Sequence, residues 1–373
     1  MISPDLLTGQ RTRGHRQAIH SLNGPMMRPG LGSFNTPFRS ESVLMASKVT
    51  IRTVARRAGV SVQTVSNVLN SPHLVRQETR AQVQAVIDEL GYRASQAARQ
   101  MRSGRSRLIG VRIEPARDGI NGNLLDRFLH ELTEAAARAG LRIMLYSAVD
   151  DAAEIRAYED LLASYSPDGF VLTSTHHDDA RAGWLLDKRV PFVTFGRPWG
   201  APDSHPWVDV DGAAGTALAT RRLLGAGHRR IGFLGSPEGA GVADDRRDGW
   251  LAAMRDAGLG PAGLARHVPD TVADGESAAD EMFDGPDGPT ALVCASDSLA
   301  LGAWHARTGR EPLPAVIGFD DTPVARAVGL TTVAQPLAEV AQACVRLLTG
   351  VLDGRAPTEH VLLEPHLVVR DSG

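Results

Sequence analysis

The segment that most constrains the fold is 50–70, TIRTVARRAGVSVQTVSNVLN. It holds two short apolar runs at helical spacing, one at Ile51, Val54, Ala55 and Ala58 and the other at Val65, Val68 and Leu69. Thr50 and Ser61 stand at the expected N-caps, and Gly59 lies where the first helix should end. Two helices joined by so short a turn are typical of a helix-turn-helix unit.

The outward face of the second helix is polar but uncharged, with Gln63, Ser66, Asn67 and Asn70 at its surface. Gln and Asn side chains can pair bidentately with adenine in the major groove of DNA. We therefore predict a helix that reads base edges. The alternative is a plain helical hairpin with a solvated polar face.

Charge is divided unevenly along the chain. Residues 48–107 carry 11 Lys/Arg against 3 Asp/Glu, and residues 1–47 carry 5 against 2. The remainder carries 24 basic and 38 acidic residues, a balance of −14, although the whole chain is only −3. A basic segment on an acidic body indicates that nucleic acid is contacted at one end only.

A third helix is expected over 78–90, ended by Gly91, which completes a helix-turn-helix domain at 46–92. The following segment, 93–107, is basic and rich in small residues. It is either a flexible linker or a hinge helix that folds only on DNA, with Met101 as an apolar wedge in the minor groove.

Residues 1–45 mix Arg, Gly, Pro and Ser without apolar periodicity, so we expect a disordered extension or a misassigned start, with Met45 as the usual first residue. They contain no apolar core of a secretory signal, and no apolar run in the chain reaches membrane-spanning length. The two cysteines, Cys294 and Cys344, have no CxxC partner and are expected to be reduced. These features favour a cytoplasmic, nucleoid-associated protein.

From residue 108 onward, short apolar runs alternate with amphipathic stretches. The runs are LIGVRI, RIMLYS, GFVLTS, FVTFG, RIGFLG, ALVCAS and AVIGFD. This alternation predicts an α/β body with parallel sheets covered by helices on both faces. Ligands in such folds bind beyond the carboxyl ends of the strands, where Glu114, His176, Arg197 and Asp320 fall.

Over residues 49–373 the chain resembles the lac repressor/galactose repressor (LacI/GalR) family of bacterial transcription regulators. The resemblance rests on VTIRTVARRAGVSVQTVSNVLN, LGY, LIGV, GHRRIGFLG, RRDGW, VIGFDD and the closing LLEPHLVVRDSG. It implies a small all-α helix-turn-helix DNA-binding domain and, over 108–373, a two-lobed α/β domain like a periplasmic binding protein. It also implies a homodimer on a palindromic double-stranded operator, and an effector between the lobes.

Carried over by position, Val62 and Gln63 would chiefly choose bases. The other residues implied to contact or face DNA are Thr50, Ile51, Arg52, Ser61, Thr64, Ser66, Asn67, Asn70, Arg76, Thr79, Tyr92, Ser95, Ala98 and Met101. The chain departs from the family pattern in having Ala94-Ser95 for Pro-Asn, Met101 for Leu, and Asn67 where Arg is common. Without that Arg, a strong partner for guanine, the operator half-site is expected to differ from the commonest family consensus.

In the body, Arg246 matches the family arginine that grips the ligand, and Asp320 matches the acidic residue that accepts polar ligand groups. The full set expected to contact effector is Glu114, Asn123, His176, Arg197, Arg246, Trp250, Asp297 and Asp320. Trp199, Trp207 and Trp250 are available as aromatic platforms, with core packing or a rim position as the alternative. A sugar or oligosaccharide is the expected effector, with a purine, another metabolite or no ligand as alternatives.

Other functions find little support. The run His176-His177-Asp178-Asp179 resembles a metal cluster, but adjacent residues cannot all ligate one ion and no spaced partner is evident. GFLGSPEGAG lacks the Lys-Ser/Thr ending of a phosphate loop, and no G-x-S-x-G nucleophile elbow is present. We expect that the protein binds no metal or cofactor and is not an enzyme. The alternative from a different functional class is a solute-binding protein, but the predicted N-terminal DNA-binding helices argue against it.

Overall fold

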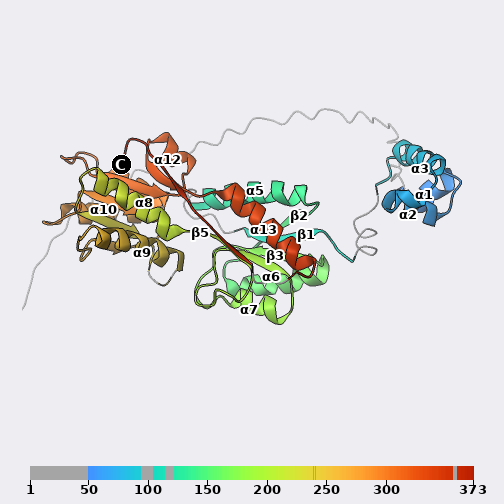
Figure 1. Ribbon diagram of the computed structural model, residues 1–373, viewed down its shortest axis with the longest axis horizontal. Helices are drawn as coiled ribbons and strands as arrows, with labels where there is room; N and C mark the ends of the chain where they lie inside the picture. The colour runs from blue at the N-terminus through green and yellow to red at the C-terminus, as the bar shows by residue number, and fades with distance from the viewer. Residues whose placement is uncertain (1–48, 94–103, 114–120, 238, 240, 356–358) are drawn as a thin grey trace, which may run out of the picture. The chain divides into compact units, whose positions relative to one another are not determined.

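The computed structural model describes residues 49–93, 104–113, 121–237, 239, 241–355 and 359–373. The described residues divide into two compact units, one ending at Gly91 and the other beginning at Tyr92 (Figure 1). The predicted extension at 1–45 lies outside the described residues. So do four residues expected to contact DNA or effector, Ser95, Ala98, Met101 and Glu114.

The N-terminal unit is a three-helix domain. Its elements are α1 (Ile51–Arg57), α2 (Val62–Asn70), the short 3-10 helix η1 (Pro72–Leu74) and α3 (Gln77–Leu90). All three α-helices pack on one another around a small core of Val54, Ala55, Ala58, Val65, Val68, Val83 and Ile87. The predicted helix-turn-helix is therefore confirmed.

Caps define where these helices begin and end. Thr50 forms a capping box with Thr53, and the Ser61 hydroxyl accepts a hydrogen bond from the Thr64 N–H at 3.0 Å. Gly91 ends α3 at a φ of 61°, a left-handed conformation that suits glycine. Arg57 pairs with Glu89 at 2.7 Å and ties α1 to α3.

The C-terminal unit holds two six-stranded sheets. We call the first sheet and its helices the N-lobe. The strands run in the order β11-β5-β4-β3-β1-β2 and all pair in parallel. Their bounds are β1 (Leu108–Ile113), β2 (Arg142–Ser147), β3 (Gly169–Leu172), β4 (Phe192–Phe195), β5 (Trp207–Val210) and β11 (His360–Leu363).

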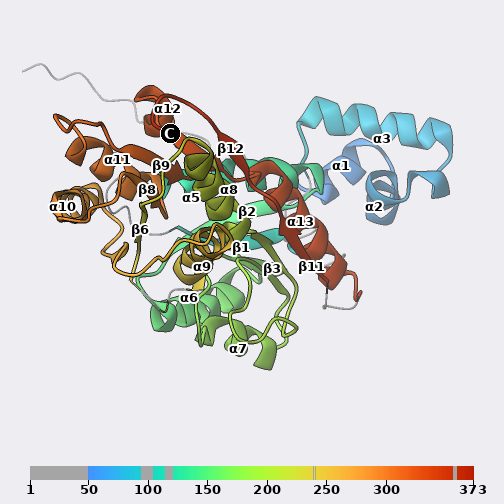
Figure 2. The same cartoon turned by 60° about the vertical axis from the view of Figure 1, so that its left-hand side comes forward.

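Helices cover both faces of this sheet. On one face pack α5 (Asn121–Arg138) and α13 (Leu337–Leu352). On the other lie α6 (Asp151–Ser164) and α7 (Ala180–Asp187), which stand together on one side of the sheet in Figure 2. The central strands β3 and β4 are largely apolar on both faces because both faces are buried.

The second sheet and its helices form the C-lobe, with the strand order β12-β10-β9-β8-β6-β7. Its strands are β6 (Ile231–Gly235), β7 (Ala265–His267), β8 (Ala291–Cys294), β9 (Ala315–Phe319), β10 (Thr331–Ala334) and the antiparallel β12 (His366–Val368). Its helices are α8 (Gly212–Gly225), α9 (Gly241–Asp256), α10 (Val272–Asp284), α11 (Asp297–Ala306) and α12 (Pro323–Ala327).

The chain passes between the lobes at three places: from β5 to α8, from β10 to α13, and from β11 to β12. The seven strands expected from the sequence are all present, whereas β5, β7, β10, β11 and β12 were not expected individually. None of the helices in the described ranges has the length and apolar character that a bilayer crossing requires.

Candidate DNA-binding surface and lobe junction

The outer face of α2 carries the side chains expected to read bases. Val62 is 42% exposed although it is apolar, and Gln63 and Asn70 are exposed as well. The Gln63 amide donates to the Asn67 Oδ1 at 2.9 Å, so the two side chains stand together on this face. Because Val65 and Val68 hold the opposite face in the core, this polar face must point outward.

The residues expected to meet the DNA backbone surround this face. Arg52 and Arg76 are exposed, while Ile51, Thr64, Ser66 and Thr79 are half-buried. The side-chain hydroxyls of Thr50 and Ser61 accept the hydrogen bonds that cap α1 and α2. Tyr92 is only 9% exposed, so most of its surface already packs against protein and little remains for the expected DNA contact.

In the C-terminal unit, charged residues meet where loops of the two lobes come together. We call this region, defined by Arg127, Arg197, Asp245, Arg246 and Asp320, the lobe junction. Arg197, which follows β4 of the N-lobe, places its Nε 2.6 Å from the Asp209 Oδ2. Its Nη1 lies 3.5 Å from the Oδ1 of Asp245, on α9 of the C-lobe.

A second contact between the lobes comes from α5. The Nη1 of Arg127 donates to the carbonyl oxygens of Asp320 at 3.2 Å and Asp321 at 2.9 Å. Both aspartates follow β9 and adopt positive φ angles, 110° and 48°. Such a strained backbone is most often held at functional sites, and here an arginine of the other lobe binds it.

The structure brings Arg246 and Asp320 together. Their closest N–O distance is 3.6 Å, and the Arg246 guanidinium lies 3.7 Å from the centroid of the Phe319 ring. The Gln335 amide donates to the Asp320 Oδ1 at 2.6 Å. Burial raises the pKa of Asp320 to about 7, against the opposing charge of Arg246.

Several buried polar atoms near this junction have no hydrogen-bond partner among the residues that the structure describes. They are the Asn123 Oδ1, the Thr175 Oγ1, the Arg197 Nη2, the Trp199 Nε1 and the Arg246 Nε. Buried polar atoms are normally paired, because an unmade hydrogen bond costs about 1–3 kcal/mol. Donors and acceptors of this kind suit a polar ligand.

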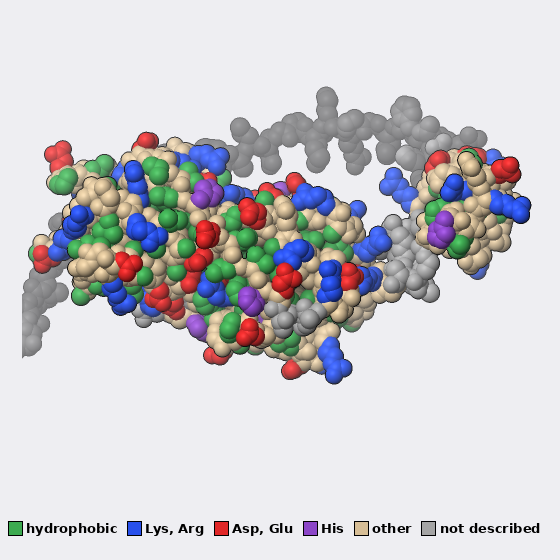
Figure 3. Space-filling model, in the orientation of Figure 1, with side chains coloured by type: hydrophobic (Ala, Val, Ile, Leu, Met, Phe, Trp, Pro, Cys, Tyr) green, Lys and Arg blue, Asp and Glu red, His purple; other side chains and the backbone are tan. Residues whose placement is uncertain are grey.

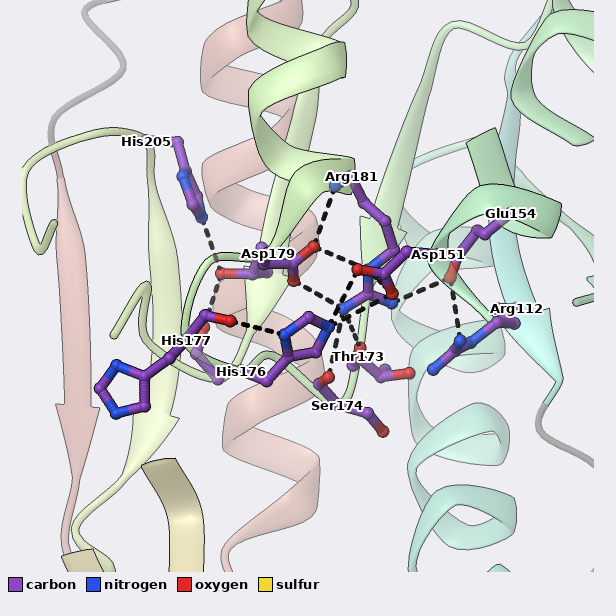
Figure 4. A network of polar contacts seen from close by, with 12 residues as sticks. Arg112, Asp151, Glu154, Thr173, Ser174, His176, His177, Asp179, Arg181 and His205 are labelled. Carbon is purple, nitrogen blue, oxygen red and sulfur yellow. Dashed lines mark hydrogen bonds and ion pairs between the residues drawn. The ribbon is translucent and has the colours of Figure 1, made fainter. Parts of the chain in front are cut away.

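His176 belongs to a different set of contacts, inside the N-lobe. Its Nε2 lies 3.1 Å from the Asp151 Oδ2, and its Nδ1 lies 2.9 Å from the His177 carbonyl (Figure 4). Both ring nitrogens are therefore engaged by protein. The expectation that His176 contacts an effector is not supported by this geometry.

Asp151 is the spaced partner that the sequence did not reveal. Ligand atoms of Asp151, His176 and Asp179 lie within 4.8 Å of one another. Figure 4 shows why this group is an ion network instead. The buried Arg181 guanidinium approaches Asp179 at 2.6 Å, Glu154 at 2.9 Å and Asp151 at 3.4 Å, and Arg112 pairs with Glu154 at 3.0 Å, so arginines already occupy the positions beside these carboxylates.

Two of the residues expected to contact effector, Trp250 and Asp297, lie in the interior of the C-lobe. Trp250 is 1% exposed, stacks on Phe233 with centroids 5.6 Å apart and donates to the Ile231 carbonyl, so it is a core residue of the C-lobe. Asp297 is also 1% exposed. Its carboxylate accepts from the Thr322 N–H at 2.7 Å and the Thr332 hydroxyl at 2.6 Å, so it supports the turn after β9.

Other residues of the junction were missed or left undecided. Arg127, Asp209, Asp245 and Gln335 carry no local sequence signal, because their importance arises from the approach of distant elements. Trp199 was one of three candidate tryptophans. Trp207 is buried and stacks on His360, which leaves Trp199 as the one of the three that lies beside a junction residue, Arg197.

Comparison with known proteins agrees with this architecture. Residues 50–95 match the family "Bacterial regulatory proteins, lacI family", and residues 220–373 match "Periplasmic binding protein-like domain". The HTH-type transcriptional regulator AglR of Rhizobium meliloti is 32% identical over 87% of this chain and 94% of its own length. The HTH-type transcriptional regulator CelR of Thermobifida fusca is 32% identical over 87% of this chain and 98% of its own length.

Solved structures give the same result. A complex of the transcriptional regulator CelR with cellobiose superposes with a TM-score of 0.65 at 30% identity, covering 87% of this chain and 100% of that chain. The lac repressor dimer bound to operator and the anti-inducer ONPF superposes with a TM-score of 0.76 at 26% identity, covering 87% and 98%. The chain therefore belongs to the LacI family of bacterial transcriptional regulators, with a helix-turn-helix DNA-binding domain followed by a two-lobed effector domain.

Proposed function

We propose that this regulator is a repressor that binds a palindromic operator as a homodimer, and that a sugar or oligosaccharide bound at the lobe junction changes its operator affinity. The observation that carries the effector proposal is the set of buried polar atoms on Asn123, Arg197 and Arg246 that have no hydrogen-bond partner within the described parts of the chain. These atoms belong to both lobes, so a ligand that bonds to them would couple the positions of the lobes.

The charges at the junction favour a neutral, hydroxyl-rich ligand. Asp245 and Asp320 can accept hydrogen bonds from hydroxyl groups, while Arg197 and Arg246 can donate. With Asp209 and Arg127 included, three carboxylates face three arginines, so the junction has no excess charge that would call for an ionic ligand. The solved cellobiose complex of the relative CelR supports the same class.

Dimer formation has support from the N-lobe surface. The strand β2 is an edge of its sheet, and Leu145 on this strand is 49% exposed. Val149, just beyond it, is 80% exposed. A sheet edge that no described strand pairs with, carrying exposed apolar side chains, favours coverage by a second copy. A dimer on chromosomal operators would be located with the nucleoid, in the cytoplasm.

The proposal is tested by fluorescence anisotropy at fixed salt. A labelled palindromic operator from the protein's own upstream region is titrated with protein, with and without a panel of sugars that includes cellobiose. We expect one sugar to shift the affinity about 5–150-fold. Arg246→Ala should abolish that shift and leave sugar-free operator binding unchanged, whereas the exposed control Arg229→Ala should behave as wild type.

Each outcome decides a part of the proposal. Specific operator binding that no sugar alters would contradict the sugar effector, and would favour a purine, another metabolite or no ligand. An Arg246→Ala protein that still responds would remove Arg246 from the site. No specific DNA binding would contradict the repressor assignment itself.

A further inference from the structure

One loop of the N-lobe reaches α9 of the C-lobe at two adjacent points. The loop is 196–199, directly after β4. Its Arg197 pairs with Asp245 on α9, as described above. Its Trp199 lies against Gly241, the first residue of α9.

The contact between Trp199 and Gly241 leaves no room for a side chain. A Cβ added to Gly241 would lie 2.1 Å from the Trp199 Cδ2, 2.3 Å from the Cγ and 2.4 Å from the Cε2. These atoms form the rigid body of the indole rather than the end of a flexible side chain. The backbone of α9 therefore packs directly onto the indole ring.

Backbone conformation does not explain the glycine. Gly239 has a φ of 87°, which favours glycine, and a Cβ there would meet nothing within 4 Å. Gly241 has the opposite combination, since its φ is outside the left-handed range and the space beside it is filled. The missing side chain at 241 is required by the indole of the other lobe.

Trp199 is also held from its own lobe. The Arg197 guanidinium carbon lies 4.9 Å from the centroid of the indole ring, a cation–π arrangement. The Trp199 Nε1 is buried without a partner among the described residues. The indole thus joins an arginine of the N-lobe to the start of a C-lobe helix, next to atoms that we assign to effector binding.

We propose that Trp199 and Gly241 form a knob and socket that sets how closely the two lobes approach, and so positions the effector-binding groups of both. This inference rests on the proposed binding of effector between the lobes. Trp199 and Gly241 are positioning residues, because they act by placing Arg197, Asp245 and Arg246. Separation of the lobes would empty the socket, so the contact exists only when the lobes are together.

The contact itself is tested without any effector, by a double-mutant cycle on the thermal midpoint of the full chain. Gly241→Ala should lower the midpoint in wild type, because the methyl group overlaps the indole. In the Trp199→Ala background the same change should leave the midpoint unchanged or raise it, because alanine favours a helix more than glycine does. Gly183→Ala in α7 is the matched control, since a Cβ there meets nothing within 4 Å.

The control should have the same effect in both backgrounds. If Gly241→Ala also changes the midpoint equally in both, the knob and socket does not exist. Loss or reversal of the destabilising effect in the Trp199→Ala background supports it. This readout is independent of whether a sugar binds.

The link to effector is tested with the anisotropy assay. Where a sugar shifts wild-type operator binding, Gly241→Ala should raise the sugar concentration at half-response at least tenfold, and Trp199→Ala/Gly241→Ala should recover part of that loss. An unchanged half-response in Gly241→Ala would overturn the positioning role. If wild type responds to no sugar, the proposed effector fails, while the midpoint cycle still decides the contact.

Discussion

The buried carboxyl group of Asp297 in the C-lobe carries a desolvation cost when it is charged. Asp297 is almost completely buried, and desolvation raises its pKa to about 6 despite hydrogen bonds from Thr322 and Thr332. The charged form is therefore less stable in the folded protein than in the unfolded chain. A residue that supports the turn holding Asp320 also makes the fold sensitive to pH.

For Asp297→Asn we expect a weaker pH dependence of stability. A raised carboxyl pKa means that the folded state takes up a proton as the pH falls through about 6, whereas the unfolded state does so only near 4. Wild type should gain about 1 kcal/mol from this group between pH 8 and pH 5. The asparagine variant should lack that gain in urea unfolding, whereas the exposed control Asp256→Asn should keep it.

Gln63 is the residue on α2 for which we expect a base-specific effect. Among the residues with described positions, its exposed amide bonds only to Asn67, so it is available to a base edge. Gln63→Ala should weaken operator binding by about 1–3 kcal/mol and relax selectivity at one position of each half-site. Competition between operator variants and random DNA measures this. An equal loss on both would show that Gln63 does not read sequence.

At the scale of elements, the helices of the DNA-binding domain depend on their caps. The domain buries only a handful of apolar side chains, and small domains have little stability in reserve. Ser61 begins α2, the helix that presents Gln63, through a hydrogen bond to the Thr64 N–H. Loss of this cap should therefore lower the stability of the domain and weaken sequence-specific DNA binding.

Ser61→Ala is expected to destabilise the DNA-binding domain by about 1 kcal/mol. The serine beyond the other end of α2, Ser71, makes no side-chain cap hydrogen bond, so Ser71→Ala is the matched control and should be near neutral. Thermal melts followed by circular dichroism compare the two. Equal effects would mean that the cap hydrogen bond contributes nothing.

At the scale of the whole molecule, the DNA-binding region and the effector domain differ in net charge. The basic excess lies in residues 48–107, and the body is acidic. On the face shown in Figure 3, acidic and basic side chains of the body are interspersed rather than gathered in one basic area. DNA should therefore be attracted to the N-terminal region and not to the effector domain.

Salt should weaken operator binding strongly and effector binding little. Phosphate contacts release counterions, so operator affinity is expected to fall at least roughly a hundredfold between about 50 and 200 mM salt. Sugar binding at the lobe junction involves a neutral ligand and should change less than about twofold. Anisotropy and calorimetry over the same salt series measure both. A salt-independent operator affinity would contradict a basic DNA-contact surface.

Local patterns in the sequence were sufficient for the helix-turn-helix and for seven of the twelve described strands. Helical periodicity, the caps at Thr50 and Ser61, and continuous apolar runs are properties of neighbouring residues. They do not require knowledge of the rest of the fold. The five remaining strands each include a polar or charged residue within three or four positions, as in β7 (ARH) and β5 (WVDV), so they are identified by the strand beside them.

The roles of the junction residues were decided by tertiary structure. The sequence by itself determined the DNA-reading helix, the alternating α/β body and the family motifs that include Arg246 and Asp320. It could not distinguish Trp250, a core residue, from Trp199, which meets the other lobe, because both are simply tryptophans near polar residues. Nor did the sequence predict that Asp151 lies beside His176, or that Asp297 accepts hydrogen bonds from Thr322 and Thr332. Burial and pairing depend on which distant elements pack together, and no local spacing encodes that.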